Sequence, residues 1–174
     1  MARIVSRLGL SRYDADEHYK LALAAYKKQN LEEALVNIGQ AIELHPRHAE
    51  YHAAQGFFYL QDGVKDKAQT AFETAIQHNR YEMMANYGRG ILAYQDKNWA
   101  EAEAHFSDAW AAMPDRPETQ YYLGLVSHRK GDQVQGLAWM KQAEASFEKV
   151  GDRGRVRDAG RWIRELTKLI ASGG

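Results

Sequence analysis

Apolar and small residues recur along most of the chain in two alternating helical patterns that short polar turns separate. In the stretch 49–82, one run carries apolar residues three and four positions apart, Asp62 and Gly63 interrupt it, and a second run follows. Steps of three and four place side chains on one face of an α-helix. Glycine accepts the left-handed backbone of a tight turn. The pattern therefore predicts two helices joined by a turn.

The same pattern returns at a fixed interval of 34 residues. A frame of small and aromatic residues marks each copy, and its positions in chain order are Ala22, Ala25, Ala34, Ile38 and Ala41; Gly56, Tyr59, Ala68, Phe72 and Ala75; Gly90, Ala93, Ala102, Phe106 and Ala109; Gly124, Ser127, Gly136, Met140 and Ala143. Four successive helix-turn-helix units are expected.

A 34-residue period with small residues and aromatics at fixed offsets resembles the tetratricopeptide repeat family. The resemblance implies an all-α, right-handed superhelix, or α-solenoid, of four repeats between an N-terminal helix and a C-terminal capping helix. The expected segments are a short amphipathic N-terminal segment at 1–14, repeats at 15–48, 49–82, 83–116 and 117–150, and a capping helix with a frayed tail at 151–174.

Polar pairs and prolines mark the turns within and between these repeats. Pro46 and Pro114 end the first and third repeats, because proline cannot continue a helix. Arg80 occupies the corresponding position in the second repeat, so a looser or more continuously helical boundary is expected there. Turns inside the repeats are predicted at Gln29-Asn30, Asp62-Gly63, Lys97-Asn98 and Gly131-Asp132.

The glycines of the frame are expected where the two helices of a repeat come closest. Ala68 and Ala102 would face them, while Tyr59, Phe72 and Phe106 would fill the gaps beside the contacts. Gly136 departs from the alanine of the other repeats, and glycine lowers helix propensity. The last repeat is therefore predicted to be the weakest and to need a cap.

Both ends of the chain carry amphipathic patterns. Near the C-terminus the apolar positions Val156, Ala159, Ile163, Leu166 and Ile170 follow at steps of three and four, which predicts a helix that covers the last repeat. Near the N-terminus the corresponding positions are Met1, Ile4, Val5 and Leu8, beside Arg3 and Arg7. This segment could pack on the first repeat, lie on a membrane or partner surface, or act as a transit peptide.

A second apolar stripe on the first helix of each repeat exceeds what repeat packing requires. In the tetratricopeptide family this face lines the concave groove, so the resemblance implies an aromatic binding trough. Its polar end would be His128 and Arg129. Two alternatives are open: the stripe is core between neighbouring repeats, or the N-terminal helix covers it. The apolar stripe consists of Tyr19, Leu23, Tyr26, Phe57, Leu60, Tyr87, Ile91, Tyr94, Tyr121 and Leu125.

Family members that bind heat-shock chaperone tails hold a terminal carboxylate with lysine, asparagine and arginine. The matching positions here are Tyr19, Leu23, Ala54, Met84 and Gly88, so such tails are not expected. An apolar or aromatic-anchored peptide or helix fits the trough better. The predicted function is a non-catalytic adaptor, scaffold or assembly factor for protein binding. The alternative is a permanent structural subunit of a larger complex, membrane-associated or not.

Composition narrows the classes of partner. No cysteine occurs among the 174 residues, which excludes disulfides and thiolate sites and fits a cytoplasmic location. The net charge is +2 for residues 1–14, −5 for 15–150 and +3 for 151–174. Without a basic face on the repeats, nucleic acid is not an expected partner. A membrane surface for residues 1–13 and a homo-oligomer remain open.

No arrangement of residues predicts a reaction or a cofactor. His45, His48 and His52 form one histidine cluster, with Glu50 as the near acid. A zinc site would need a complete ligand set, and surface or packing roles fit these histidines better, so neither a metal nor another cofactor is expected. Because no nucleophile, base and orienting acid can be assigned from spacing, catalytic residues are not expected either.

Overall fold

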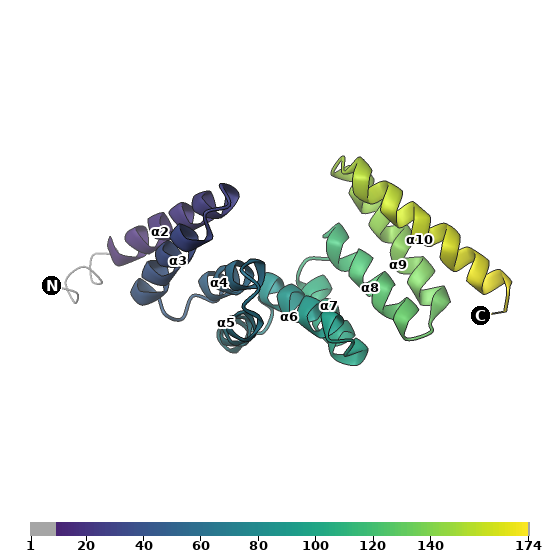
Figure 1. The fold of residues 1–174 in the computed structure, drawn as a ribbon, viewed down its shortest axis with the longest axis horizontal. Helices are drawn as coiled ribbons and strands as arrows, with labels where there is room; N and C mark the ends of the chain where they lie inside the picture. Colours follow the sequence, from purple (N-terminus) through teal and green to yellow (C-terminus); the bar gives the residue numbers. More distant parts are fainter. Residues whose placement is uncertain (1–9, 174) are drawn as a thin grey trace. The chain divides into compact units, whose positions relative to one another are not determined.

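The computed structural model describes residues 10–173, which form α-helices joined by short turns and contain no strand (Figure 1). The expected apolar positions Met1, Ile4, Val5 and Leu8 lie outside the described residues. The first described helix begins at Leu10, five residues before the predicted start of the first repeat at residue 15.

The chain divides into two compact units, Met1–Gly88 and Arg89–Gly174, and each is described by itself. The boundary lies inside helix α6 (Met83–Gln95), which contributes to both units. The other helices of the first unit are α2 (Leu10–Lys27), α3 (Leu31–Leu44), α4 (Ala49–Gln61) and α5 (Lys65–His78), and those of the second are α7 (Trp99–Ala112), α8 (Pro117–Arg129), α9 (Gln133–Lys149) and α10 (Arg153–Ala171).

Helices that follow each other along the chain pack together within each unit. In the first unit α2 contacts α3, α3 contacts α4, and α4 contacts α5. In the second unit α7 contacts α8, α8 contacts α9, and α9 contacts α10. The described residues therefore have the all-α repeat fold that the periodic pattern predicted.

The turns inside the helix pairs lie where the polar pairs predicted them. Gln29, Gly63, Lys97 and Gly131 each have a positive φ, between 60° and 87°, and each is the second residue after the first helix of a pair. The side chains of Asn30, Asn98 and Asp132 then accept hydrogen bonds from the first turn of the next helix. Such N-caps satisfy backbone donors that have no partner inside the helix.

The turns between helix pairs share a side-chain hydrogen bond that sequence reasoning missed. His52 Nε2 lies 2.8 Å from the Pro46 carbonyl oxygen. Asn86 Nδ2 donates to the Arg80 carbonyl at 2.8 Å, and Gln120 Nε2 donates to the Pro114 carbonyl at 2.7 Å. The turn at Arg80 is consequently closed like the two at proline, and it is not continuously helical.

Nineteen of the twenty frame positions are buried, which confirms them as the packing core. Tyr59 is the exception, since it lies half-buried with Lys67 Nζ 5.3 Å from its ring centroid. Its neighbour Phe58, which is not a frame position, is buried with 2% of its surface exposed.

The frame glycines are points of close approach between helices. A β-carbon added at Gly56 would lie 2.5 Å from the Phe72 ring, and one at Gly90 would lie 2.7 Å from the Phe106 ring. Real β-carbons do not reach such distances, so these positions require glycine unless the ring moves. Both close contacts agree with the sequence-based prediction.

Helix α10 packs on α9 with the predicted apolar side. Asp152 caps its first turn by accepting a hydrogen bond from the Arg155 amide at 3.0 Å. Ala159 and Leu166 are fully buried, whereas Ile170 keeps 36% of its surface exposed. The helix continues through Ala171.

Candidate functional site

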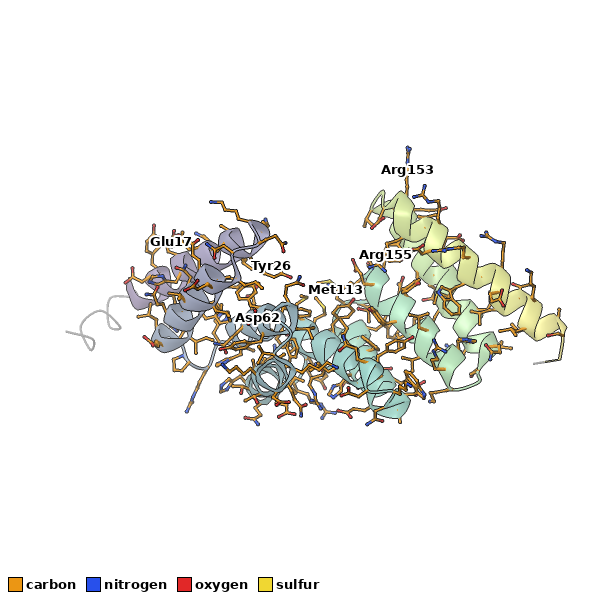
Figure 2. The ribbon with its side chains drawn as sticks, viewed as in Figure 1. Glu17, Tyr26, Asp62, Met113, Arg153 and Arg155 are labelled. Carbon is orange, nitrogen blue, oxygen red and sulfur yellow. The ribbon has the colours of Figure 1, made fainter. Side chains whose placement is uncertain are left out.

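The first unit carries five of the predicted groove residues on α2 and α4, and all five are half-buried. We call this set the first aromatic surface. Tyr26 stacks on Phe58 with ring centroids 4.9 Å apart, and Figure 2 labels its position near the end of α2. One side of each ring therefore packs on the neighbouring helix while the rest of it stays accessible. The first aromatic surface consists of Tyr19, Leu23, Tyr26, Phe57 and Leu60.

Tyr19 is fixed in place at both its ring and its hydroxyl. The ring lies 5.0 Å from that of Tyr51, and the hydroxyl donates a 2.9 Å hydrogen bond to Glu50 Oε1. Burial, reinforced by the Glu50 carboxylate, raises the pKa of Tyr19 well above its usual value. The phenol is therefore a neutral donor at physiological pH, and it is oriented by the first turn of α4.

Tyr87, on α6, has a different position from the other predicted residues of the first unit. Only 7% of its surface is exposed, and its ring lies 6.3 Å from that of Phe57. Phe57 in turn contacts Phe72 edge-on at 5.0 Å. Tyr87 is part of the core, so it supports the accessible ring of Phe57 and does not extend the surface.

The second unit carries a comparable set on α6 and α8, which we call the second aromatic surface. Tyr94 makes edge-on contacts with Trp99 at 5.2 Å and Tyr122 at 5.6 Å. Tyr121 lies against Phe147, and the Arg155 guanidinium carbon lies 5.8 Å from its ring centroid. The second aromatic surface consists of Ile91, Tyr94, Tyr121 and Leu125, each half-buried.

The chemistry of Tyr121 is set by the capping helix. Burial raises the pKa of its phenol, while the Trp162 hydrogen bond and the Arg155 charge act in the opposite direction. Figure 2 shows Arg155 next to the start of α8, whereas Arg153 projects away from the helices of this unit. Helix α10 thus places the Arg155 guanidinium at the second aromatic surface, whereas Arg153 lies away from it.

His128, at the predicted polar end of the surface, is half-buried like the aromatic residues. Its ring lies 5.2 Å from that of Trp162, and its Nδ1 is 2.7 Å from Gln133 Oε1. The histidine therefore contacts both α9 and α10. Arg129, the other predicted polar residue, is exposed at the end of α8.

Comparison with known proteins assigns the family. A family model described as tetratricopeptide repeat matches residues 19–68 and 59–117, which together span more than half of the chain. The chain belongs to the tetratricopeptide repeat family. Among curated proteins, none matches the sequence.

Solved tetratricopeptide structures share the fold at low sequence identity. A Pseudomonas aeruginosa pilF structure is 19% identical, with a TM-score of 0.70 over 90% of this chain and 78% of that one. MamA from Desulfovibrio magneticus RS-1, residue 41 to its end, is 18% identical, with a TM-score of 0.65 over 91% and 96%. The first repeat domain of Spaghetti (RPAP3), bound to the HSP90 peptide SRMEEVD, is 16% identical, with a TM-score of 0.65 over 68% and 97%.

Four aromatic residues that support the tetratricopeptide surfaces were missed by sequence reasoning. Tyr51 and Phe58 lie under Tyr19 and Tyr26, while Tyr122 and Trp162 contact Tyr94 and His128. Phe58 and Tyr122 each directly follow a residue of the predicted stripe, Phe57 and Tyr121. A search for aromatic residues beside the stripe would have found these two, but not Tyr51 or Trp162.

Two histidines of the predicted cluster make packing or turn contacts. His48 stacks on Tyr51 at 4.0 Å, and His52 holds the turn at Pro46. Within residues 10–173, no group of three or more histidine or acidic side chains is arranged to hold a metal ion. Members of the tetratricopeptide repeat family are generally non-catalytic scaffolds.

None of the helices in the described part of the chain combines the length and apolar character that crossing a membrane requires.

Proposed function

We propose that this protein is a non-catalytic adaptor that binds a partner protein through its two aromatic surfaces. Tetratricopeptide domains typically bind other proteins or peptides. The face proposed here is the one that lines the concave groove in that family. Each unit presents its own part of the face, so each can hold one anchor of a partner.

The observation that carries this proposal is the partial burial of nine predicted residues. Tyr19, Tyr26, Phe57, Tyr94 and Tyr121 each pack one side on a neighbouring aromatic ring, yet none is fully buried. Pre-ordered aromatic rings lose little conformational entropy when a ligand binds. Such residues are frequent among the side chains that dominate binding energy.

The chemistry of the surfaces favours an apolar or aromatic-anchored peptide or helix. Tyrosine offers rigid apolar area together with a hydroxyl, but the Tyr19 hydroxyl is already used by Glu50. The positions where chaperone-binding relatives carry carboxylate donors hold other residues here. A partner helix with apolar residues at steps of three and four fits better than an acidic tail.

One tyrosine from each unit tests the proposal. We expect the Tyr26→Ala, Tyr94→Ala double variant to keep its helical content and to lose about 2 kcal/mol or more of binding free energy per anchor. Affinity capture with wild type and variant, read by mass spectrometry, identifies a partner that depends on the surfaces. Titration of that purified partner against both proteins then measures the loss.

The matched control replaces two tyrosines outside the surfaces. Tyr13 and Tyr81 are 65% and 61% exposed. The Tyr13→Ala, Tyr81→Ala double variant therefore also removes two tyrosine side chains, but none from the proposed site. Binding that falls equally in both double variants, or a collapse of thermal stability in Tyr26→Ala, Tyr94→Ala, would show that the tyrosines are structural.

A further inference from the structure

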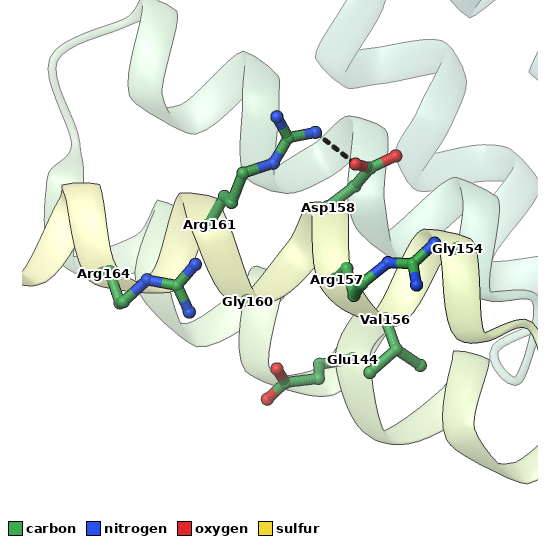
Figure 3. Close-up of a pocket in the computed structure, with 8 residues that line it drawn as sticks. All are labelled: Glu144, Gly154, Val156, Arg157, Asp158, Gly160, Arg161 and Arg164. Carbon is green, nitrogen blue, oxygen red and sulfur yellow. Dashed lines mark hydrogen bonds and ion pairs between the residues drawn. The ribbon is translucent and has the colours of Figure 1, made fainter.

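A groove between α9 and α10 lies outside the surfaces described above. It encloses about 730 Å³. Its described lining comes from Glu144 on α9 and from residues 154–164 on α10 (Figure 3). The lining consists of three arginines, two acidic residues, one valine and two glycines, so it is mostly polar.

Two of the three arginines are not neutralised within the described residues. Arg161 pairs with Asp158 on the same helix. Arg157 and Arg164 form no ion pair with any described acid, although Glu144 lines the same groove. Figure 3 shows their guanidinium groups between the Arg161–Asp158 pair and Glu144. A guanidinium stays charged at all physiological pH values, so these two are standing anion-binding groups.

The arginines follow the helix at regular spacing. Arg153, Arg157, Arg161 and Arg164 are separated by four, four and three residues, which places them on one side of α10. A neighbouring hollow of about 560 Å³ shares Val156 and Arg157 with the groove and adds Arg153 and Glu148. The groove and this hollow together form a continuous lining, which we call the arginine groove.

Gly160 lines the arginine groove at a position where a larger residue would contact Glu144. It is buried in the middle of α10, where glycine is unfavourable for the helix. A β-carbon added there would lie 3.0 Å from Glu144 Oε1. The glycine therefore leaves room for the Glu144 carboxylate beside α10.

We propose that the arginine groove binds an acidic helical segment of a partner protein, with carboxylates paired to Arg157 and Arg164. These two arginines are seven residues apart, or about 10.5 Å along the helix axis. A docked helix with acids at positions i and i+7 presents carboxylates at the same spacing. Arginine and carboxylate can form two parallel hydrogen bonds per pair.

The acids in the lining favour a polypeptide over a uniform polyanion. Glu144, Glu148 and Asp158 would repel a continuous row of phosphates at the same place where the arginines attract one. The preceding stretch 15–150 also carries a net charge of −5. A helix that alternates acidic and basic side chains matches both kinds of group in the lining.

The test uses a fluorescent helical peptide of about 18 residues with glutamates at i, i+4, i+7 and i+11 in an alanine and lysine background. The full chain is titrated against it at low salt, and fluorescence polarisation reports binding. The same peptide with glutamines at those positions is the ligand control. We expect the glutamate peptide to bind at least about ten-fold more tightly than the glutamine peptide, because two charge-assisted pairs are lost.

The variant R157Q/R164Q should reduce binding of the glutamate peptide by about ten-fold or more. Both side chains are exposed, so the fold is expected to survive, and circular dichroism verifies it. K27Q/K28Q, which removes two exposed charges from the first unit, should change binding less than about two-fold.

Equal affinity for the glutamate and glutamine peptides would overturn the proposal, as would an equal loss in the two charge variants. Tighter binding of a single-stranded oligonucleotide, or of vesicles containing phosphatidylserine, that disappears in R157Q/R164Q would also overturn it and assign the groove to that ligand. Because Tyr26 and Tyr94 are unchanged in these variants, the result is independent of the aromatic surfaces.

Discussion

The contact between α4 and α5 in the first unit and the contact between α8 and α9 in the second unit occupy the same frame positions. They are packed by different kinds of side chain. Phe72 of α5 lies in a notch formed by Gly56 and Gly88, whose added β-carbons would both collide with its ring. Where the frame brings Phe72, the second pair has Met140, whose Cε would lie 2.9 Å from a β-carbon at Gly124. An aromatic ring occupies one contact and a flexible thioether the other.

The backbones of the second pair also approach each other. A β-carbon at Gly136 would lie 3.2 Å from the Gly124 carbonyl oxygen. The sequence suggested that Gly136 only weakens α9 by lowering helix propensity. Its position shows a packing reason as well, because alanine would press on backbone. The same repeat frame can therefore be packed in two ways: by a rigid aromatic ring between glycines, as at Phe72, or by a close approach of the two helix backbones, as at Gly136.

The largest expected effect follows from removing the aromatic ring of Phe72. Phe72→Ala should lower the free energy of unfolding by about 3–5 kcal/mol, because glycines on both sides of the ring cannot fill the cavity. Met140→Ala should cost less within the range of about 2–5 kcal/mol, since the backbones there are already close. Urea denaturation followed by circular dichroism measures both. A larger loss for Met140→Ala would reverse the comparison.

Much of the fold could be predicted from the sequence because it depends on local spacing. The turns that contain Gln29, Gly63, Lys97 and Gly131 could be predicted from the 34-residue period and from residues that start or stop helices. The notch at Gly56 follows from the pairing of glycine with an aromatic at a fixed offset. These features need only the order of residues along one helix pair.

The accessible surface could be predicted only in part, because it depends on contacts between successive pairs. Tyr87 has the same apolar character as Tyr94, yet only Tyr87 is buried. His128 contacts Trp162 of the capping helix, and the sequence did not indicate this contact. Tyr59 was expected to fill a gap beside the close contacts, but it is only half-buried, whereas Phe58 next to it is buried. The rotation of each helix against its neighbour decides these cases.

An intermediate effect is expected from adding a side chain at a frame glycine of the second unit. Gly90→Val should cost about 1–3 kcal/mol, because the buried Phe106 ring lies 2.7 Å from the new β-carbon. Gly124→Val should cost less, since unbranched methionine can move its terminal methyl group. The difference between the two unfolding free energies is the quantity to measure. Equal losses would mean that backbone contact limits both sites.

The smallest effect separates helix propensity from packing at Gly136. Gly39, in the middle of α3, has nothing within 4 Å of an added β-carbon, so Gly39→Ala should stabilise the protein by about 0.5–1 kcal/mol. Gly136→Ala gains the same propensity but presses on the Gly124 carbonyl, so it should give no stabilisation or a small loss. Both variants are compared by urea denaturation under identical conditions. A gain at Gly136 equal to that at Gly39 would show that α8 and α9 can separate by a few tenths of an ångström at no cost, and the close backbone contact would then be incidental to the stability of the second unit.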